Sequence, residues 1–414
     1  MSLYFVKFAW KNIWRNRRRT LITIQAIALG LMALIAIHNY YDAFHEQVIS
    51  NVIRFHSGHV SLAHVGYAKD NQRELYLKNP APVLEFLRHD PSVVAFGERI
   101  WLQGLLSSAH GSASVLFGGI RPEVESHVTG YAQNMVKGTY FGRSSKATPI
   151  VLGTSLASTL GVDVGSKLVA LTQGVDGSIG NELFSVSGIF HTESDADKSL
   201  AFVPLGTARS LSSVPQGALH QISVLLKSET DIQPFLNRCH AAFPPSLQIE
   251  ALPWTQVQRH VVAMIELDKA VNRLLMTVIL VVASLGVANA ILMGLMERTR
   301  EFGVMMAMGT SSWRIVKLAV AETLWLAAVG AFLGNIFGIT VTEFFHWKGF
   351  DLRWLTRRNL VIDGAIIRTV NYPSIHWGNN IQVSVTILAL AFVAALWPAH
   401  YMARLKVTDA LRTH

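Results

Sequence analysis

The sequence predicts an α-helical membrane protein with four transmembrane helices and a large α+β domain outside the membrane. Half of its 414 residues are hydrophobic and only 15% are charged, whereas soluble domains carry about a quarter charged residues. Four apolar runs approach the length of about 20 residues that a helix needs to cross a bilayer. Basic residues gather beside these runs, so the formal charge of +9 indicates a membrane protein and argues against a nucleic-acid partner.

The four apolar runs define the predicted spans. None contains Lys or Arg, and only the third contains an acid, Glu322. A cleaved signal peptide is the alternative for the first run, but its one Ala-x-Ala, at Ala26–Ala28, falls in the middle of the run, so we expect an uncleaved anchor. The predicted spans are 20–41 (with the apolar run at Leu21–Ile37), 274–296, 318–341 and 381–397.

The distribution of charge predicts the orientation of the chain. Residues 1–19 carry a net charge of +6, and residues 297–317 and 398–414 each carry +2. Because cytoplasmic loops are enriched in Lys and Arg, we expect both termini and the 297–317 segment in the cytoplasm. The 42–273 segment, with a net charge of −2, and the 342–380 loop are then on the outside.

The outside domain is predicted to contain a repeated strand–helix–strand unit. Alternating apolar residues indicate strands, and Pro82 precedes an apolar helical pattern. The two units form a split α/β subdomain over about 42–106 and 219–265. The insertion between them, about 107–218, is rich in turn residues and is predicted to be mostly β. The predicted strands and the second helix are 58–63, 93–106, 220–227, 231–243 (helix) and 247–252.

Several motifs resemble the FtsX-like, MacB-type permeases of type VII ABC transporters. Ala9–Leu21 (AWKNIWRNRRRTL) is similar to their N-terminal amphipathic helix, which places such a helix at residues 1–19. Asn289–Met293, followed by Glu297–Gly303 (ERTREFG) and Ala307-Met308-Gly309, resembles the signature at the end of their second span. Val151–Ala157 (VLGTSLA) is similar to the outside domain of the superfamily, notably its lipoprotein-releasing Lol branch.

This resemblance implies a non-catalytic permease subunit in a bacterial inner membrane. The sequence contains no Gly-x-x-x-x-Gly-Lys-Ser/Thr loop, so ATP and Mg²⁺ are expected on a partner ABC ATPase and no cofactor on this chain. The implied partners are that ATPase, a second permease subunit (identical or different), membrane lipid, and a lipoprotein substrate with a periplasmic chaperone or adaptor. The alternatives are export of peptides or small hydrophobic compounds with an adaptor and an outer-membrane duct, or an FtsX-like scaffold that activates a cell-wall hydrolase.

The 297–317 segment is the predicted site of coupling to the ATPase. Its charged residues are close enough in sequence to meet at helical spacings of three or four. Charge alone favours a solvated loop, but the signature match favours a docking element that moves with the ATPase. The residues assigned to this role are Glu297, Arg298, Arg300, Glu301, Gly303, Met308 and Gly309.

The third span carries a stripe of glycines, Gly330, Gly334 and Gly338. Glycines at this spacing let two helix backbones approach closely, which is typical of a dimer seam. Packing against another span of the same chain is the alternative. Asn289 in the second span is assigned to the same packing role.

Other reactive residues predict no further site. His56, His59 and His64 do not share one strand face, so we expect no metal centre. Cys239 is the only cysteine, which excludes an intrachain disulfide, and we expect it in the core of the second repeat helix. No catalytic arrangement is predicted.

Overall fold

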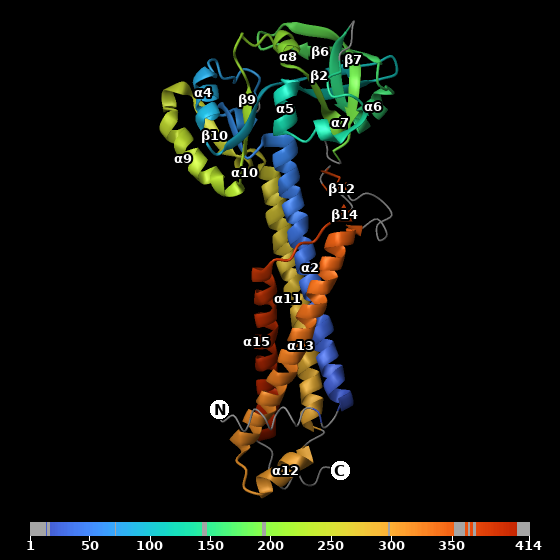
Figure 1. Cartoon of the computed structure of the whole chain (residues 1–414), viewed down its shortest axis with the longest axis vertical. Helices are drawn as coiled ribbons and strands as arrows, with labels where there is room; N and C mark the ends of the chain where they lie inside the picture. The colour runs from blue at the N-terminus through green and yellow to red at the C-terminus, as the bar shows by residue number, and fades with distance from the viewer. Residues whose placement is uncertain are drawn as a thin grey trace. The chain divides into compact units, whose positions relative to one another are not determined.

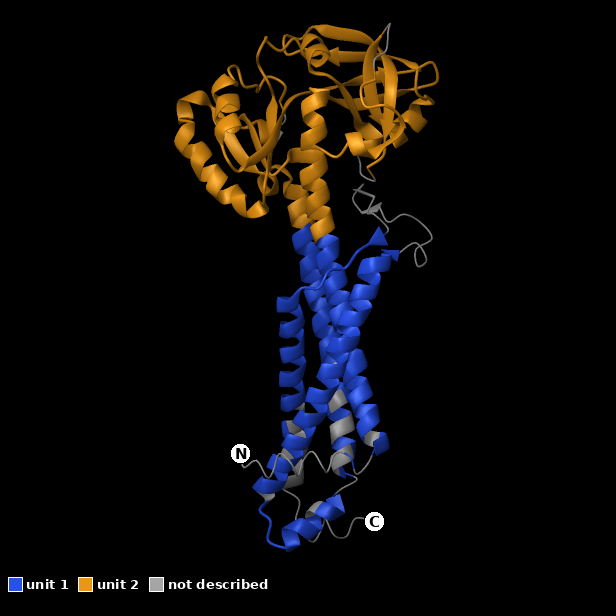
Figure 2. Cartoon of the chain, viewed as in Figure 1, with its two compact units in different colours: residues 1–45, 265–352, 370–414 blue, residues 46–264, 353–369 orange. Residues whose placement is uncertain are grey.

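The computed structural model of the chain divides into two compact units, which we describe separately (Figure 2). Unit 1 comprises residues 1–45, 265–352 and 370–414, and unit 2 comprises residues 46–264 and 353–369. The structure describes residues 14, 17–70, 72–142, 147–192, 196–296, 299–351, 361–362, 365–366 and 370–403. Most of the predicted N-terminal amphipathic helix and most of the C-terminal tail lie outside the described residues.

Unit 1 is built mainly from long helices (Figure 1). Two of them, α2 and α11, also contribute residues to unit 2. The helices are α2 (Arg17–Val52), α11 (Arg259–Met296), α12 (Thr299–Ala307), α13 (Ser312–Lys348) and α15 (Trp377–Ala403). A two-residue antiparallel ladder joins β11 (Phe350–Asp351) to β14 (Val370–Asn371).

The long helices exceed the apolar runs that predict them. Helix α2 continues to Val52, and α11 begins at Arg259. Neither 42–52 nor 259–273 contains Gly or Pro, so nothing in these polar extensions breaks a helix. Within the described residues, Thr20–Ser57, Arg259–Gly286 and Trp313–Lys348 are long and apolar enough to span a membrane, and Trp377–Val393 is a shorter apolar helix. The number of spans therefore stays a prediction.

Small residues allow the helices of unit 1 to pack closely. Leu31 and Ile35 of α2 share a buried cluster with Ala327 and Ala331 of α13 and with residues of α15. Between α13 and α15, the Asn335 side-chain amide donates a hydrogen bond to Ser384 Oγ at 2.9 Å. Interhelical polar contacts of this kind are common where helices pack in a membrane.

The α/β subdomain of unit 2 has the predicted repeat, and each strand and helix of the repeat is confirmed within a few residues. The four strands form one antiparallel sheet in the order β10-β1-β9-β2. Helices α4 and α9 pack against each other, with the Phe86 and Phe235 ring centroids 6.1 Å apart. The elements are β1 (Val60–His64), α4 (Ala81–His89), β2 (Val93–Ser107), β9 (Gln221–Leu226), α9 (Ile232–Ala242) and β10 (Ile249–Pro253), with the short helices α3 (Tyr67–Asp70), η3 (Glu229–Asp231), η4 (Pro245–Leu247) and α10 (Trp254–Val257).

Strands make up more of the insertion of unit 2 than helices do, as the sequence predicts, but the insertion also contains short helices that the sequence does not predict. Short apolar patterns explain the difference: in α6, for example, Leu156 and Leu160 lie one turn apart and are fully buried. The strands are β3 (Ser112–Ile120), β4 (Met135–Gly138), β5 (Thr148–Gly153), β6 (Lys167–Gln173), β7 (Ile179–Phe190) and β8 (Leu200–Pro204), and the helices are α5 (Pro122–Val128), η2 (Ala132–Asn134), α6 (Thr154–Leu160), α7 (Ala196–Ser199) and α8 (Leu205–Ser212). A separate ladder pairs β12 (Val361–Ile362) with β13 (Ala365–Ile366).

Strand β2 joins the two parts of unit 2. Residues Val93–Arg99 pair with β9 of the α/β subdomain, and residues Ile100–Ser107 pair with β3 of the insertion. The strands of both parts therefore belong to one ten-stranded sheet in the described chain. The insertion is therefore a continuation of the α/β sheet rather than a tethered domain.

Candidate functional site

The segment between α11 and α13 forms the short helix α12, and one side of this helix packs against α13. Met305 packs against the buried Leu318 and Ala321 of α13. The other side carries exposed apolar side chains in the described structure. These side chains are Val304, Met308 and, at the start of α13, Trp313, which are 44%, 75% and 63% exposed.

Gly309 ends α12 in a Schellman motif. The Thr310 N–H donates to the Met305 carbonyl at 3.0 Å, and the Gly309 N–H donates to the Met306 carbonyl at 3.0 Å. Gly309 has φ +90°, a conformation that residues with a Cβ rarely adopt. The turn thus fixes where α12 ends and α13 begins.

The residues predicted for coupling gather on α12 and its terminal turn where the structure describes them. Gly303 is buried, Arg300 and Met308 are exposed, and Glu301 is half-buried. Glu297 and Arg298 lie outside the described residues. The docking of this segment to an ATPase stays a prediction.

The glycine stripe of α13 faces α2 of the same chain. A Cβ at Gly330 would lie 2.8 Å from Ile27 Cβ, and one at Gly334 would lie 2.9 Å from the Ala28 carbonyl oxygen. Gly338 approaches Ile35 in the same way. The structure therefore shows the intrachain alternative, because a second copy could use these glycines as a seam only by displacing α2. Asn289 is exposed on α11 and takes no part in this contact.

A second candidate site in unit 2 surrounds the end of α2, where the helix closes with a π-helical turn, η1 (Ile53–Ser57). Four consecutive carbonyl oxygens of this turn accept hydrogen bonds. The Gly58 N–H donates to Ile53 and the Gly130 N–H to Arg54, both at 3.1 Å. The donors to the next two carbonyls are side chains: Tyr131 Oη to Phe55 at 2.7 Å and Arg99 Nη1 to His56 at 2.5 Å.

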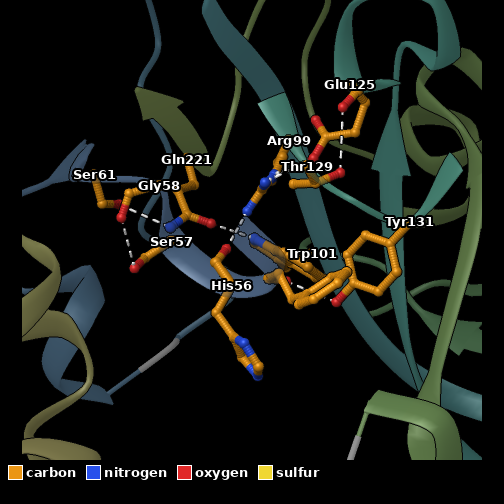
Figure 3. A network of polar contacts seen from close by, with 11 residues as sticks. His56, Ser57, Gly58, Ser61, Arg99, Trp101, Glu125, Thr129, Tyr131 and Gln221 are labelled. Atoms are coloured by element: carbon orange, nitrogen blue, oxygen red, sulfur yellow. Dashed lines mark hydrogen bonds and ion pairs between the residues drawn. The ribbon is translucent and has the colours of Figure 1, made fainter. Parts of the chain in front are cut away.

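Three of these donors come from outside the helix. Helices commonly close on their own backbone, whereas here residues of β2 and of the segment after α5 satisfy the terminal carbonyls (Figure 3). Burial raises the pKa of Tyr131 far above its ordinary range, so its hydroxyl keeps the proton that it donates. We call Arg99, Gly130 and Tyr131 the η1 clamp.

Arg99 is held in place by a buried ion pair. Its Nη2 and Nε donate to Glu125 Oε1 of α5 at 2.6 and 3.2 Å, and the two side chains are 2% and 1% exposed. Glu125 Oε2 has no hydrogen-bond partner in the described part of the chain. Breaking such a pair on one side costs about 3–5 kcal/mol, because a charge is left buried. The pair therefore fixes the guanidinium beside the His56 carbonyl.

An open cleft of about 690 Å³ lies beside the η1 clamp. Its lining includes Ser61, Trp101 and Gln221 from three neighbouring strands of the sheet. Trp101 Nε1 donates to Gln221 Oε1 at 2.6 Å, and Gln221 Nε2 donates to Ser61 Oγ at 2.8 Å (Figure 3). The polar side chains are thus largely occupied with one another.

His220, which also lines the cleft, is fixed in one tautomer. Its Nε2 lies 2.9 Å from the Arg73 carbonyl oxygen and must donate, while its Nδ1 accepts the Trp101 N–H at 3.1 Å. The ring stacks on Tyr67 with centroids 5.7 Å apart. Burial lowers the pKa of His220, in agreement with a neutral ring.

His59, His64 and Cys239 have ordinary structural surroundings. His59 Nδ1 accepts the Leu226 N–H at 3.1 Å, and His64 Nδ1 bonds the Val65 carbonyl at 2.9 Å. Among the residues that the structure describes, no group of three or more His, Cys, Asp and Glu side chains could hold a metal ion. Cys239 lies on α9 and is 1% exposed.

Sequence reasoning missed the η1 clamp. The available signal was Arg99, a charged residue beside the apolar Ile100 and Leu102 in a strand. Because its partners Glu125 and the His56 carbonyl are distant in sequence, no local pattern could identify them.

Two family models together match most of the chain. The model of the FtsX-like permease C-terminal domain matches residues 273–407, and that of the MacB-like periplasmic core domain matches residues 20–241. The lipoprotein-releasing system transmembrane protein LolC of Neisseria meningitidis is 23% identical over 410 residues, which cover 95% of this chain and 94% of LolC. LolE of Haemophilus influenzae is 21% identical over 341 residues, which cover 79% of each chain.

A further relative is matched over a smaller part. The macrolide export ATP-binding/permease protein MacB of Marinobacter nauticus is 27% identical over 224 residues, which cover 50% of this chain and 33% of MacB. Helical spans, a MacB-like core and an FtsX-like C-terminal part define a class of membrane permease. The chain belongs to the FtsX-like permeases with a MacB-like periplasmic core domain, and it is an ABC transporter permease of the LolC, LolE and MacB type.

Proposed function

We propose that this chain is the permease subunit of an inner-membrane ABC complex that releases lipoproteins, driven by a separate ATPase. The observation that carries the proposal is the extent of the match to LolC, which includes almost the full length of both chains. By contrast, only a third of the macrolide exporter is matched. The absence of a P-loop from these 414 residues supports an ATPase on another chain.

The α12 segment is the proposed contact with that ATPase. It combines the charged Arg300 and Glu301 with the exposed apolar Met308 and Trp313. Aromatic residues, Met and Arg are enriched at protein interfaces. Because the Met305 side of α12 packs against α13, a push on α12 would be passed directly to that helix.

Depletion of the protein in its native cell tests the proposed cargo. Inner and outer membranes are separated after depletion, and lipidated proteins in each fraction are quantified by mass spectrometry. Lipoprotein release predicts that outer-membrane lipoproteins accumulate in the inner membrane. Correct sorting together with loss of an exported compound would instead support the efflux alternative, and correct sorting together with unprocessed cell wall would support the scaffold alternative.

A further inference from the structure

We infer that Arg99 and Tyr131 are positioning residues, which lock the end of α2 to the sheet of unit 2 so that helix and sheet move as one body during transport. The inference rests on the proposed function in one respect, because one of its two measurements is the release of lipoprotein. Its structural basis is the η1 clamp, in which three donors from outside the helix bind three consecutive carbonyls of η1.

The η1 turn is also part of the hydrophobic core of the insertion. Phe55 of η1 lies in a buried cluster with Phe190 and Phe202, and Tyr131 contacts all three rings, with centroids 4.6 to 5.3 Å apart. The same Tyr131 therefore packs against the side chain of Phe55 and donates to its carbonyl. Aromatic pairs of this geometry contribute about 0.5–1.5 kcal/mol beyond their buried area.

No flexible linker separates η1 from the sheet. Gly58 follows η1 directly, and the His59 N–H already bonds the Val224 carbonyl of β9 at 2.9 Å. Gly58 has φ +66° and ψ −167°, a region that is essentially restricted to glycine. A Cβ at this position would lie 2.6 Å from the Val224 carbonyl oxygen, so the turn and the strand are in direct contact.

The charge of Arg99 suits its position at the end of a helix. The carbonyl end of a helix carries partial negative charge, which a cation stabilises. Lysine could supply that charge but not the planar fork that bonds Glu125 and the His56 carbonyl together. The clamp thus requires an arginine at this position, oriented by Glu125.

A pair of tyrosine variants isolates the clamp from general stability. Tyr131→Phe removes the hydroxyl that bonds the Phe55 carbonyl and leaves the ring in place. Tyr140→Phe is the matched control, because the buried Tyr140 hydroxyl has no hydrogen-bond partner among the described residues. Arg99→Lys is a second variant, which keeps the charge and loses the fork.

The measurements are made on the full chain in complex with its ATPase. Hydrogen exchange of the amides of residues 54–60 reports opening of η1, with and without ATP and vanadate. Loss of one hydrogen bond is expected to raise the exchange rate about fivefold in Tyr131→Phe, and Tyr140→Phe should match the unaltered protein. The second readout is the amount of lipoprotein released per ATP hydrolysed, which should fall in Tyr131→Phe and Arg99→Lys while assembly and ATP hydrolysis persist.

Two results would overturn the inference. The first is unchanged release per ATP in Tyr131→Phe despite faster exchange, which would make η1 a structural contact only. The second is loss of η1 protection in the unaltered protein when ATP and vanadate bind, because a rigid connection cannot open during the cycle. Failure of the unaltered protein to release any lipoprotein would instead refute the proposed cargo. Hydrogen exchange of η1 with and without ATP and vanadate would then show whether the clamp stays closed.

Discussion

The buried ring of His220 predicts that the stability of unit 2 depends on pH. Its neutral ring donates to the Arg73 carbonyl and accepts the Trp101 N–H. A proton added to Nδ1 would therefore face the Trp101 N–H, which is itself a donor. Burial lowers the pKa of His220 below the ordinary 6.5. The unfolded state therefore binds more protons below about pH 6.5, and stability that is present at higher pH is lost as the pH falls.

We predict that His220→Gln reduces this pH dependence. The opening free energy at the Trp101 amide, measured by hydrogen exchange and corrected for the intrinsic rate, should fall by up to about 1.4 kcal/mol per pH unit below pH 6.5 in the unaltered protein. In His220→Gln the Trp101 amide should open more easily at pH 7.5. Its opening free energy should also depend less on pH, because the contribution of the His220 ring is gone. His89→Gln, at a side chain that is 75% exposed, is the control, and an equal effect there would contradict the assignment.

At the level of residues, the sequence predicts which side chains are buried better than it predicts which side chains contact each other. Cys239 is buried as predicted, because apolar spacing along a helix is a local property. Arg99 and Glu125 are both buried as well, yet the residues around each of them in the sequence do not identify its partner. Their partner choice depends on the tertiary approach of α5 and β2.

At the level of elements, the α13 glycine stripe gives a prediction about packing within unit 1. Gly334→Leu places a bulky side chain where a Cβ alone would lie 2.9 Å from the Ala28 carbonyl and from Leu31 Cβ. Overpacking of this kind costs about 1–3 kcal/mol or more, so the variant protein should be less abundant in the membrane and melt at lower temperature in detergent. Gly286→Leu on α11 is the control, because nothing lies within 4 Å of that position. Normal abundance and melting of Gly334→Leu would show that α2 does not pack on the stripe.

The α12 segment gives a prediction about coupling. Reversal of Glu297 and Glu301 to Lys makes the segment more positive, which the positive-inside rule tolerates, whereas like charges at an interface cost on the order of several kcal/mol. The double variant should enter the membrane normally, lose the ATPase on purification and stop transport.

Glu123→Lys with Glu229→Lys is the matched control for this variant. It makes the same change in net charge at exposed positions of unit 2, and it should keep the ATPase. A Glu297/Glu301 variant that retains its ATPase and transports normally would show that α12 is only a connection between helices.

The elements themselves were predictable where the pattern is local. The strand–helix–strand repeat has clear alternation and helical spacing, and the structure confirms it. Helices α2 and α11 are longer than the apolar runs predict. An apolar run indicates the part of a helix that lies in the membrane and not where the whole helix ends. The partner of the glycine stripe depends on which helices of one chain meet, which spacing alone does not encode.

At the level of the whole molecule, the order of the two units along the chain follows from the sequence. The charge pattern separates 42–273 from the spans, and the structure assigns 46–264 to unit 2. The contribution of the described strand pair β12 and β13 to unit 2 was not predictable, because the 342–380 loop has no strong alternation. Which side of the membrane each unit occupies depends on charge and not on packing.

We predict that unit 2 and the α12 turn lie on opposite sides of the membrane. Ser178 and Ser311 are both exposed, so a cysteine at either position should react with a membrane-impermeant thiol reagent that reaches it. Burial raises the pKa of Cys239 to about 12, and Cys239→Ser removes its residual background. In intact spheroplasts Ser178→Cys should be labelled, whereas Ser311→Cys should be labelled only after lysis. Labelling of Ser311→Cys from outside would reverse the orientation, and with it α12 could not meet an ATPase that uses cytoplasmic ATP.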